Sequence, residues 1–184
     1  MLGTEQERWL LERLSRSTAR WNLIAQQMLM MDLDLSRTSE ASKRLTSMDS
    51  WGGYPAARER LLTRLQQRKI TNTVILSGDA HQHFAGDVLR TPDDAAVAAE
   101  FLVTSATSGG DGRGALAGNE EILRRNPSLR MLQDRRGYGI CSVTQDRWTT
   151  ELVSLSHVTS AQAPSNSVAR FVVEPGRAGI AQQE

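Results

Sequence analysis

The stretch NTVILSGDAHQHFAGDV, residues 72–88, decides how the sequence is interpreted. Its first part, TVILS at 73–77, is a short apolar run rich in β-branched residues, which is typical of a buried strand. The run ends in a glycine, and Asp79, His81 and His83 then follow at every second position. Side chains alternate faces in an extended segment, so this spacing predicts a carboxylate and two imidazoles on one side of the chain.

This position and these side chains favour a metal site. Ligand sites of α/β proteins gather at the C-terminal ends of strands. A carboxylate with imidazoles suits Zn, Fe or Mn, whereas Ca²⁺ would use only the carboxylate. We therefore predict Asp79, His81 and His83 as metal ligands, with a purely structural role for histidines in a turn left open. A two-metal hydrolase would need further ligands from other strands. Other acidic residues are available, but their spacing singles none of them out: Asp49, Asp87, Glu100 and Asp111.

The bulk properties are those of one globular domain of 184 residues. A net charge of +1 gives no argument for a nucleic-acid partner or for an anionic membrane surface. No apolar run approaches the ~20 residues of a membrane helix. The N-terminus, MLGTEQERWLLERL, does not have the pattern of a signal peptide, because charges interrupt each apolar patch. The only cysteine, Cys141, excludes an internal disulfide, and its apolar neighbours predict that it packs inside a strand.

The rest of the chain predicts a mixed α/β fold in which helices cover the sheets. Thr4 and Glu7 form a capping-box pattern that predicts the start of the first helix. Helices are expected at 5–16, 55–69 and 119–125, and strands at 21–25, 73–77, 84–90, 96–105, 137–143 and 147–155. Residues 32–53 and 106–118 are expected to be loops. We expect one domain over 1–157 and a loosely attached tail at 158–184.

Four segments of the sequence together resemble the C-terminal part of PhoD-like alkaline phosphatases, which are metal-dependent phosphoesterases of the calcineurin-like superfamily. They occur in the family's order over residues 1 to about 155. The segments are LGTEQERWLLERLSRSTARWNLIAQQMLM at 2–30, DSWGGYPAARERLL at 49–62, VILSGDAHQHFAGDV with AAEFLVTSATSGGDG at 74–88 and 98–112, and DRRGYGICSVTQDRW at 134–148.

The resemblance implies part of a four-layer α/β/β/α metallophosphoesterase sandwich. It also implies hydrolysis of phosphate monoesters or diesters at a metal cluster of iron and calcium, or of another divalent metal. Asp79 and His81 occupy the positions of the family's late metal ligands in its G-D-x-H motif, and His83 is a further candidate ligand. Arg113, in the glycine-rich loop, is a candidate contact for the substrate phosphate. The family is exported, whereas this N-terminus has no signal pattern, so the location of the chain is left open.

The chain departs from the family in two ways. Gly52 stands where the family's W-D-G-Y segment has an aspartate. The family's earlier metal-binding segments are also missing, so we expect a truncated gene product, a fragment or one half of a split protein, with the missing N-terminal half as a candidate partner.

Two other functions compete with the phosphatase interpretation. The first is a catalytically inactive remnant, or the partner-binding half of a split phosphatase. The second is an amidohydrolase-type metal site, because H-x-H after a strand also opens those sites. Amidohydrolases need a barrel of ~250 residues, so the length of this chain argues against that alternative.

Overall fold

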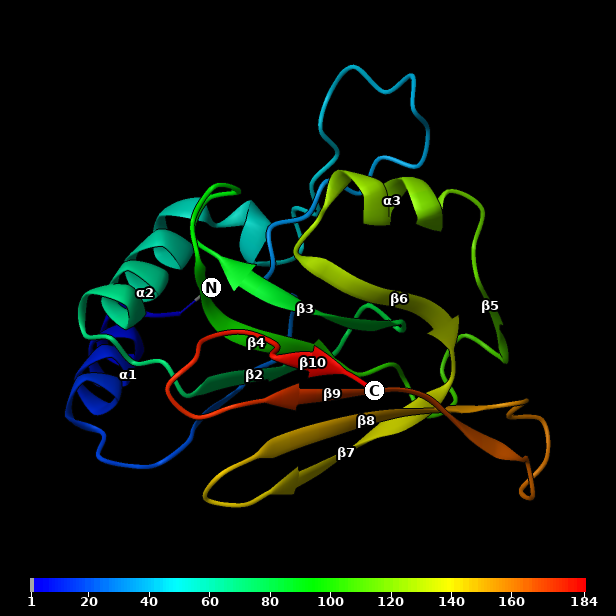
Figure 1. Ribbon diagram of the computed structural model, residues 1–184. Coiled ribbons are helices and arrows are strands. Elements are labelled where there is room, and N and C mark those ends of the chain that lie inside the picture. The colour runs from blue at the N-terminus through cyan, green and yellow to red at the C-terminus, as the bar shows by residue number, and fades with distance from the viewer. Residues whose placement is uncertain (1) are drawn as a thin grey trace.

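The apolar run at 73–77 forms strand β2 (Thr73–Ser77), in which residues on both faces are buried. This is the composition expected inside a covered sheet. The computed structural model describes residues 2–184, and its elements are arranged as in Figure 1. The others are α1 (Thr4–Arg16), β1 (Asn22–Ala25), a 3-10 helix η1 (Trp51–Gly53), α2 (Pro55–Gln67), β3 (His83–Leu89), β4 (Ala96–Leu102), β5 (Gly112–Gly114), α3 (Asn119–Arg125), β6 (Leu129–Arg135), β7 (Gly137–Val143), β8 (Trp148–Leu155), β9 (Ser165–Val173) and β10 (Gln182–Gln183).

Two sheets are formed. The first has six strands in the order β1-β2-β4-β3-β6-β5, with β1, β2 and β4 parallel and the remaining pairs antiparallel. The second has four antiparallel strands in the order β10-β9-β8-β7. The mixed α/β class predicted from the sequence is therefore confirmed. The sequence analysis did not predict strand β6, because its sequence, LRMLQDR, is polar at most positions.

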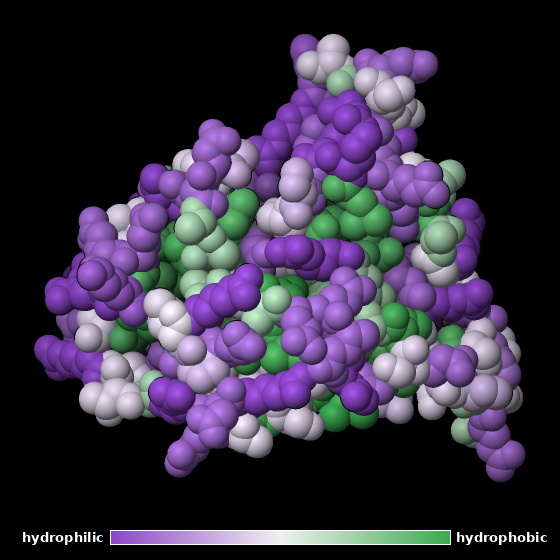
Figure 2. Space-filling view, viewed as in Figure 1, coloured by the Kyte–Doolittle hydropathy of each residue, from purple (hydrophilic) through white to green (hydrophobic). Residues whose placement is uncertain are grey.

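Two hydrophobic clusters separate the layers. One lies between the three helices and the first sheet, and includes Leu62 of α2, Ile122 of α3 and Phe84 of β3. The other lies between the two sheets, where Phe101 and Phe171 pack with ring centroids 5.8 Å apart. Figure 2 shows hydrophobic residues in a band between the helices and the second sheet, flanked by hydrophilic ones. The margins of both clusters therefore reach the surface on this face.

The described residues form three layers rather than four. All three helices pack on the first sheet, and none contributes to the cluster between the sheets. Residues 2–184 place no helix on the outer face of the second sheet, where Tyr138 and Ile140 are 44% and 45% exposed. No helix in this range has both the length and the apolarity to cross a bilayer.

The C-terminal segment is not the loosely attached tail that was expected. Strand β9 pairs with β8 from Trp148 to Leu155, and its Phe171 and Val173 are fully buried between the sheets. Small polar residues dominate the segment, so its few apolar residues give little signal in the sequence. The second sheet would lose two of its four strands without residues 158–184.

Two local expectations are also wrong. The capping box is not formed, because Thr4 is the first helical residue and the N-cap, Gly3, makes no side-chain bond. Glu7 instead binds Arg60 of α2, with Oε2 accepting from Nη2 at 2.9 Å, so contact between the two helices replaces the local cap. Cys141 is exposed rather than packed inside, because β7 is an edge strand whose residues after Gly137 are all exposed.

A buried carboxylate ties the first long loop to the sheet. Glu100, fully buried in β4, accepts hydrogen bonds from the Met30 N–H at 2.8 Å, the Met31 N–H at 2.7 Å and the Ser77 hydroxyl at 2.6 Å. Arg58, from α2, donates from Nε to the Met30 carbonyl at 2.7 Å. Burial raises the pKa of Glu100 to about 7, although these donors and the charge of Arg58 favour the ionised form. The start of the loop is therefore held by side chains of β4 and α2.

This arrangement predicts that Glu100→Gln is destabilising, because the amide NH2 that replaces one oxygen only donates, whereas both oxygens of a carboxyl group can accept a backbone N–H in either protonation state. The expected loss is about 1–3 kcal/mol of unfolding free energy near pH 5. A raised pKa means that the stability contributed by Glu100 is complete below pH 4.5 and is lost as the pH approaches 7. The advantage of the wild type over the variant should therefore shrink from pH 5 to pH 8 in urea unfolding. An advantage that grows with pH would contradict this assignment.

Candidate functional site

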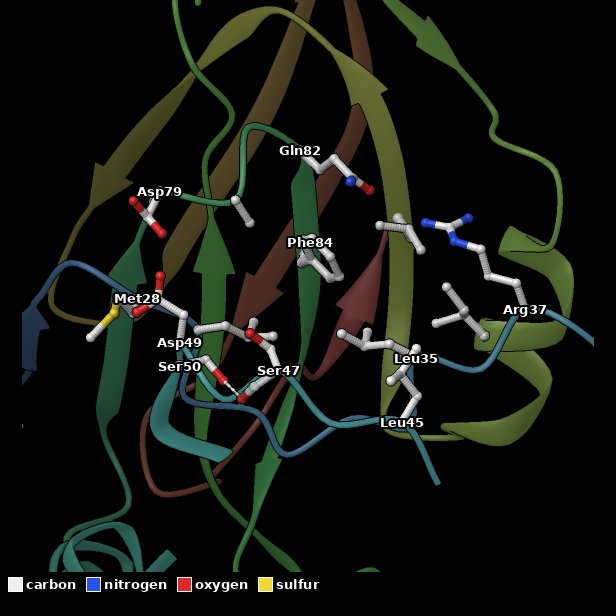
Figure 3. Close-up of a pocket in the computed structure, with 15 residues that line it drawn as sticks. Met28, Leu35, Arg37, Leu45, Ser47, Asp49, Ser50, Asp79, Gln82 and Phe84 are labelled. Carbon is white, nitrogen blue, oxygen red and sulfur yellow. Dashed lines mark hydrogen bonds between the residues drawn. The ribbon is translucent and has the colours of Figure 1, made fainter. Parts of the chain in front are cut away.

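A cavity of about 410 Å³ opens on the helix-covered side of the first sheet, beside the C-terminal end of β2 and the start of β3. Figure 3 shows the carboxylates of Asp49 and Asp79 pointing toward each other at one side of this cavity. Both residues are exposed, and no described residue gives either carboxylate a hydrogen bond or an ion pair. The lining residues are Met28, Leu29, Leu35, Arg37, Leu45, Ser47, Asp49, Ser50, Gly78, Asp79, Ala80, Gln82, Phe84, Ile122 and Leu132.

Segment 26–31 brings these two aspartates together. Its Gln27 carbonyl accepts from the N–H of Gly78, directly before Asp79, at 3.0 Å. Its Leu29 carbonyl accepts from the N–H of Trp51, two residues after Asp49, at 3.0 Å. The same segment is held by Glu100 at Met30 and Met31. Two residues 30 positions apart in the sequence thereby meet at one wall of the cavity.

The backbone around Asp79 and His81 is not extended, so the predicted common face with His83 is wrong. Asp79 has a φ of 70° and His81 a φ of 54°, both in the left-handed region, and residues 79–82 form a bend. Non-glycine residues in this region are strained by about 1–2 kcal/mol, and such strain concentrates at functional sites. The strain here places Asp79 at the cavity, whereas His81 does not line it. The roles of both residues as metal ligands stay predictions.

His83 lies on the opposite face of β3. Its neighbour Phe84 lines the cavity, and side chains alternate along a strand, so His83 points toward the second sheet. The side chain is fully buried. Burial lowers the pKa of His83 to about 4; the backbone carbonyl of Val153 partly opposes this effect, and the charge of Arg136 adds to it. The ring is therefore neutral at physiological pH, and the sheet separates it from the carboxylates of Asp49 and Asp79.

Arg136 holds the glycine-rich loop beside His81. It is only 2% exposed, and its Nη1 donates to the Ser105 hydroxyl at 3.0 Å and to the Ser108 carbonyl at 2.9 Å. A Cβ added at Gly109, where φ is 85°, would lie 3.4 Å from Arg136 Nη1 and 3.7 Å from His81 Nδ1. These distances leave room for a Cβ, so it is the positive φ rather than close packing that favours glycine at position 109.

Several buried polar atoms near these strand ends have no hydrogen-bond partner among the described residues. They are Gln82 Oε1, His83 Nε2, Thr104 Oγ1 and Arg136 Nε. Such atoms usually bind ordered water, and each costs about 1–3 kcal/mol when left unpaired. Their concentration here marks the C-terminal ends of β2 and β4 as a polar region inside the protein.

The remaining sequence candidates lie elsewhere or were not singled out. Arg113, in β5, is exposed and does not line the cavity, so its proposed contact with substrate phosphate stays a prediction. Asp49 was one of four acidic residues without a distinguishing pattern, and only the fold joins it to Asp79. At Gly52, where the sequence resemblance implies an aspartate, an added Cβ would lie 2.7 Å from Thr46 Cγ2, so a larger residue would displace the Thr46 side chain.

These features define a mixed α/β protein with two packed sheets and an acidic cavity at the strand ends. The model of the PhoD-like phosphatase family matches residues 1–152. The chain therefore belongs to the PhoD-like phosphatase family.

Two relatives show how much of the family's protein this chain represents. It is 36% identical over 183 residues to alkaline phosphatase D of Bacillus subtilis (strain 168), and the match covers 98% of this chain and 31% of that protein. The solved structure of PhoD superposes with a TM-score of 0.89 at 34% identity, over 98% of this chain and 35% of the other. The chain thus spans about a third of the length of these relatives.

The facing carboxylates predict that Asp79→Asn stabilises the metal-free chain, because one of two like charges is removed. We expect a gain of about 0.5 kcal/mol in unfolding free energy at pH 7, which decreases as salt is added. Asp93→Asn is the matched control, since Asp93 is exposed and lies away from the cavity. Equal effects of the two substitutions at every salt concentration would show that Asp49 and Asp79 do not repel each other.

Proposed function

We propose that this chain supplies part of the active site of a metal-dependent hydrolase of phosphate monoesters or diesters. The pair of facing, unpartnered carboxylates of Asp49 and Asp79 is the observation that carries the proposal. Two further facts support it, namely membership of a phosphatase family and the name alkaline phosphatase D of its Bacillus relative.

The two carboxylates suit a hard divalent cation, but they are not a complete set of ligands. Carboxylate oxygens bind Ca²⁺ and the harder transition metals, so Asp49 and Asp79 would hold the ion, with His81 as the third candidate. Residues 2–184 contain no group of three or more His, Cys, Asp or Glu side chains placed to bind one metal. We therefore also propose that further ligands come from outside these residues and that the bound ion is iron or calcium. A bound metal would polarise the phosphoryl oxygens and supply a hydroxide nucleophile.

The chain's own residues would bind and orient the ester. The Gln82 amide and the Ser47 hydroxyl line the cavity and can donate hydrogen bonds to phosphoryl oxygens, whereas the Ser50 hydroxyl already donates to the Ser47 carbonyl at 2.9 Å. The apolar floor, which includes Phe84, would receive the alcohol part of the ester and exclude water from it. The competing proposal is a catalytically inactive remnant, and Gly52, in the place of a family aspartate, is the observation that favours it.

We also propose that the chain acts with the rest of the PhoD-like domain, supplied by another polypeptide or a longer one. Strand β1 forms one edge of the first sheet and β7 one edge of the second, while β5 and β10 form the other two edges. The β1 and β7 edges lie on one side, because Trp21, directly before β1, donates from Nε1 to the Thr144 carbonyl after β7 at 2.6 Å. Leu23 on β1 and Ile140 on β7 are 50% and 45% exposed. Unprotected apolar edges of this kind accept further strands.

The function proposal predicts metal-dependent phosphatase activity that needs both aspartates. The assay would use 4-nitrophenyl phosphate and its bis ester, with iron and calcium, and the chain combined with the remaining segments of the Bacillus relative. Asp79→Asn and Asp49→Asn should each lower kcat at least ~100-fold, because a charged ligand is lost. Asp93→Asn should leave kcat unchanged. Full activity of the Asp79 variant would refute the site, and stoichiometric metal without activity would favour the inactive remnant.

The partner proposal predicts that Cys141 becomes protected. This single thiol is exposed on the free edge strand, so a maleimide should modify it readily in the isolated chain. Pairing of β7 with an added strand should slow modification at least ~10-fold when the remaining segments are supplied. The control places the thiol in the β3–β4 turn through Cys141→Ser with Asp93→Cys, and its rate should not change. Equal rates at Cys141 with and without these segments would exclude β7 as the contact.

A further inference from the structure

The cavity has opposite charges at its two sides. Figure 3 shows Asp49 and Asp79 on one side, the guanidinium of Arg37 on the other, and Phe84 between them. The remaining floor is apolar and consists of Leu29, Leu35, Leu45, Ile122 and Leu132. A ligand that filled this space would therefore place one end beside Asp49 and Asp79 and its other end beside Arg37.

Arg37 is exposed at the rim of the cavity, and no described residue forms an ion pair with it. Its Nη1 donates to the Ala117 carbonyl at 3.0 Å and to Asn119 Oδ1 at 2.9 Å, and both acceptors are neutral. No carboxylate of residues 2–184 forms an ion pair with it, in contrast to Arg125, which pairs with Asp34 at 3.0 Å. The charge at this wall is thus available to a ligand.

The backbone fixes the position of Arg37. Gly118 has a φ of 82°, and a Cβ added there would lie 2.5 Å from Arg37 Cβ. The loop therefore packs directly against the turn before α3, and the two neutral hydrogen bonds orient the guanidinium from the same side. A preorganised, uncompensated arginine beside an apolar floor suits the carboxylate of an amphiphilic molecule.

We infer that the cavity selects esters whose alcohol part is an apolar chain ending in a carboxylate, with the carboxylate bound by Arg37. The inference rests on the proposed function, because that function places the phosphoryl group at the Asp49–Asp79 wall. It adds the substrate class, and it makes Arg37 a specificity-determining residue. The subsite formed by Arg37 and the apolar floor does not itself need a metal, so it can be tested in the metal-free chain.

The experiment is an NMR titration of the metal-free chain with octanoate and with octan-1-ol, which have the same apolar chain and differ in charge. The wild type should bind octanoate roughly fivefold or more tightly than octan-1-ol. Arg37→Gln should reduce octanoate binding to the level of octan-1-ol. Arg113→Gln, which removes an exposed arginine outside the cavity, should leave the preference intact. Equal binding of the two ligands to the wild type, or equal effects of the two substitutions, would overturn the inference.

A second variant separates loss of charge from loss of structure. Arg37→Gln removes two hydrogen bonds, so it could disturb the floor, and weaker binding of octan-1-ol would reveal this. Arg37→Lys then distinguishes loss of charge from loss of structure, because lysine keeps the positive charge. A retained preference for octanoate supports the inference, and a lost preference overturns it.

The same outcomes distinguish this inference from the proposed function. An Arg37-dependent preference for octanoate in a protein without phosphatase activity would leave the subsite standing and refute the function. Phosphatase activity without any preference for octanoate would refute only the subsite.

Discussion

The carboxylate of Glu100 is the constraint on which the candidate site depends. It is buried in the centre of the first sheet and accepts the N–H groups of Met30 and Met31. A carboxylate so far from water is costly, and the cost is offset only while its donors are in place. The hydrogen bonds therefore act in both directions, since the loop supplies donors to the buried carboxyl group and the carboxyl group fixes the loop. Residues 26–31, fixed in this way, reach Gly78 on one side and Trp51 on the other, and so set the separation of Asp79 and Asp49.

The walls of the cavity follow from the same frame. Asp79 is held in a left-handed conformation with its carboxylate opposite that of Asp49, and neither charge has a partner among the described residues. Strained backbone and unbalanced like charges both reduce stability, and a protein keeps them where a ligand relieves them. The four unpaired polar atoms at the strand ends belong to the same pattern. The cluster between the three helices and the first sheet, by contrast, is densely apolar, which explains how the fold tolerates a destabilised site.

The sequence predicts the parts of this protein that depend on local pattern. The β-branched run at 73–77 and the helix at 119–125 end at the predicted residues, because their signals are confined to a few neighbouring positions. Strands β6 and β9 were missed because each is stabilised by pairing with strands far away in the chain rather than by its own apolar periodicity. The site divides in the same way. Asp79 stands out through its motif, whereas Asp49 becomes recognisable only after Glu100 has positioned the loop between them. His83 illustrates the limit of spacing arguments, since two left-handed residues break the alternation that placed it beside Asp79.

The open edges and the incomplete donor set have one common explanation. Strands β1 and β7 end the two sheets on the same side of the molecule, joined by the contact of Trp21 with Thr144. Four large apolar side chains are exposed on these strands, namely Leu23, Tyr138, Ile140 and Val143, and the chain spans about a third of its relatives' length. A polypeptide that continued both sheets at once would bury these residues and would close the second sheet against solvent. The carboxylates at the cavity would then receive donors that residues 2–184 do not contain. Under the proposals made above, the stability of the sheets and the remaining ligands of a metal would therefore be gained in one assembly step.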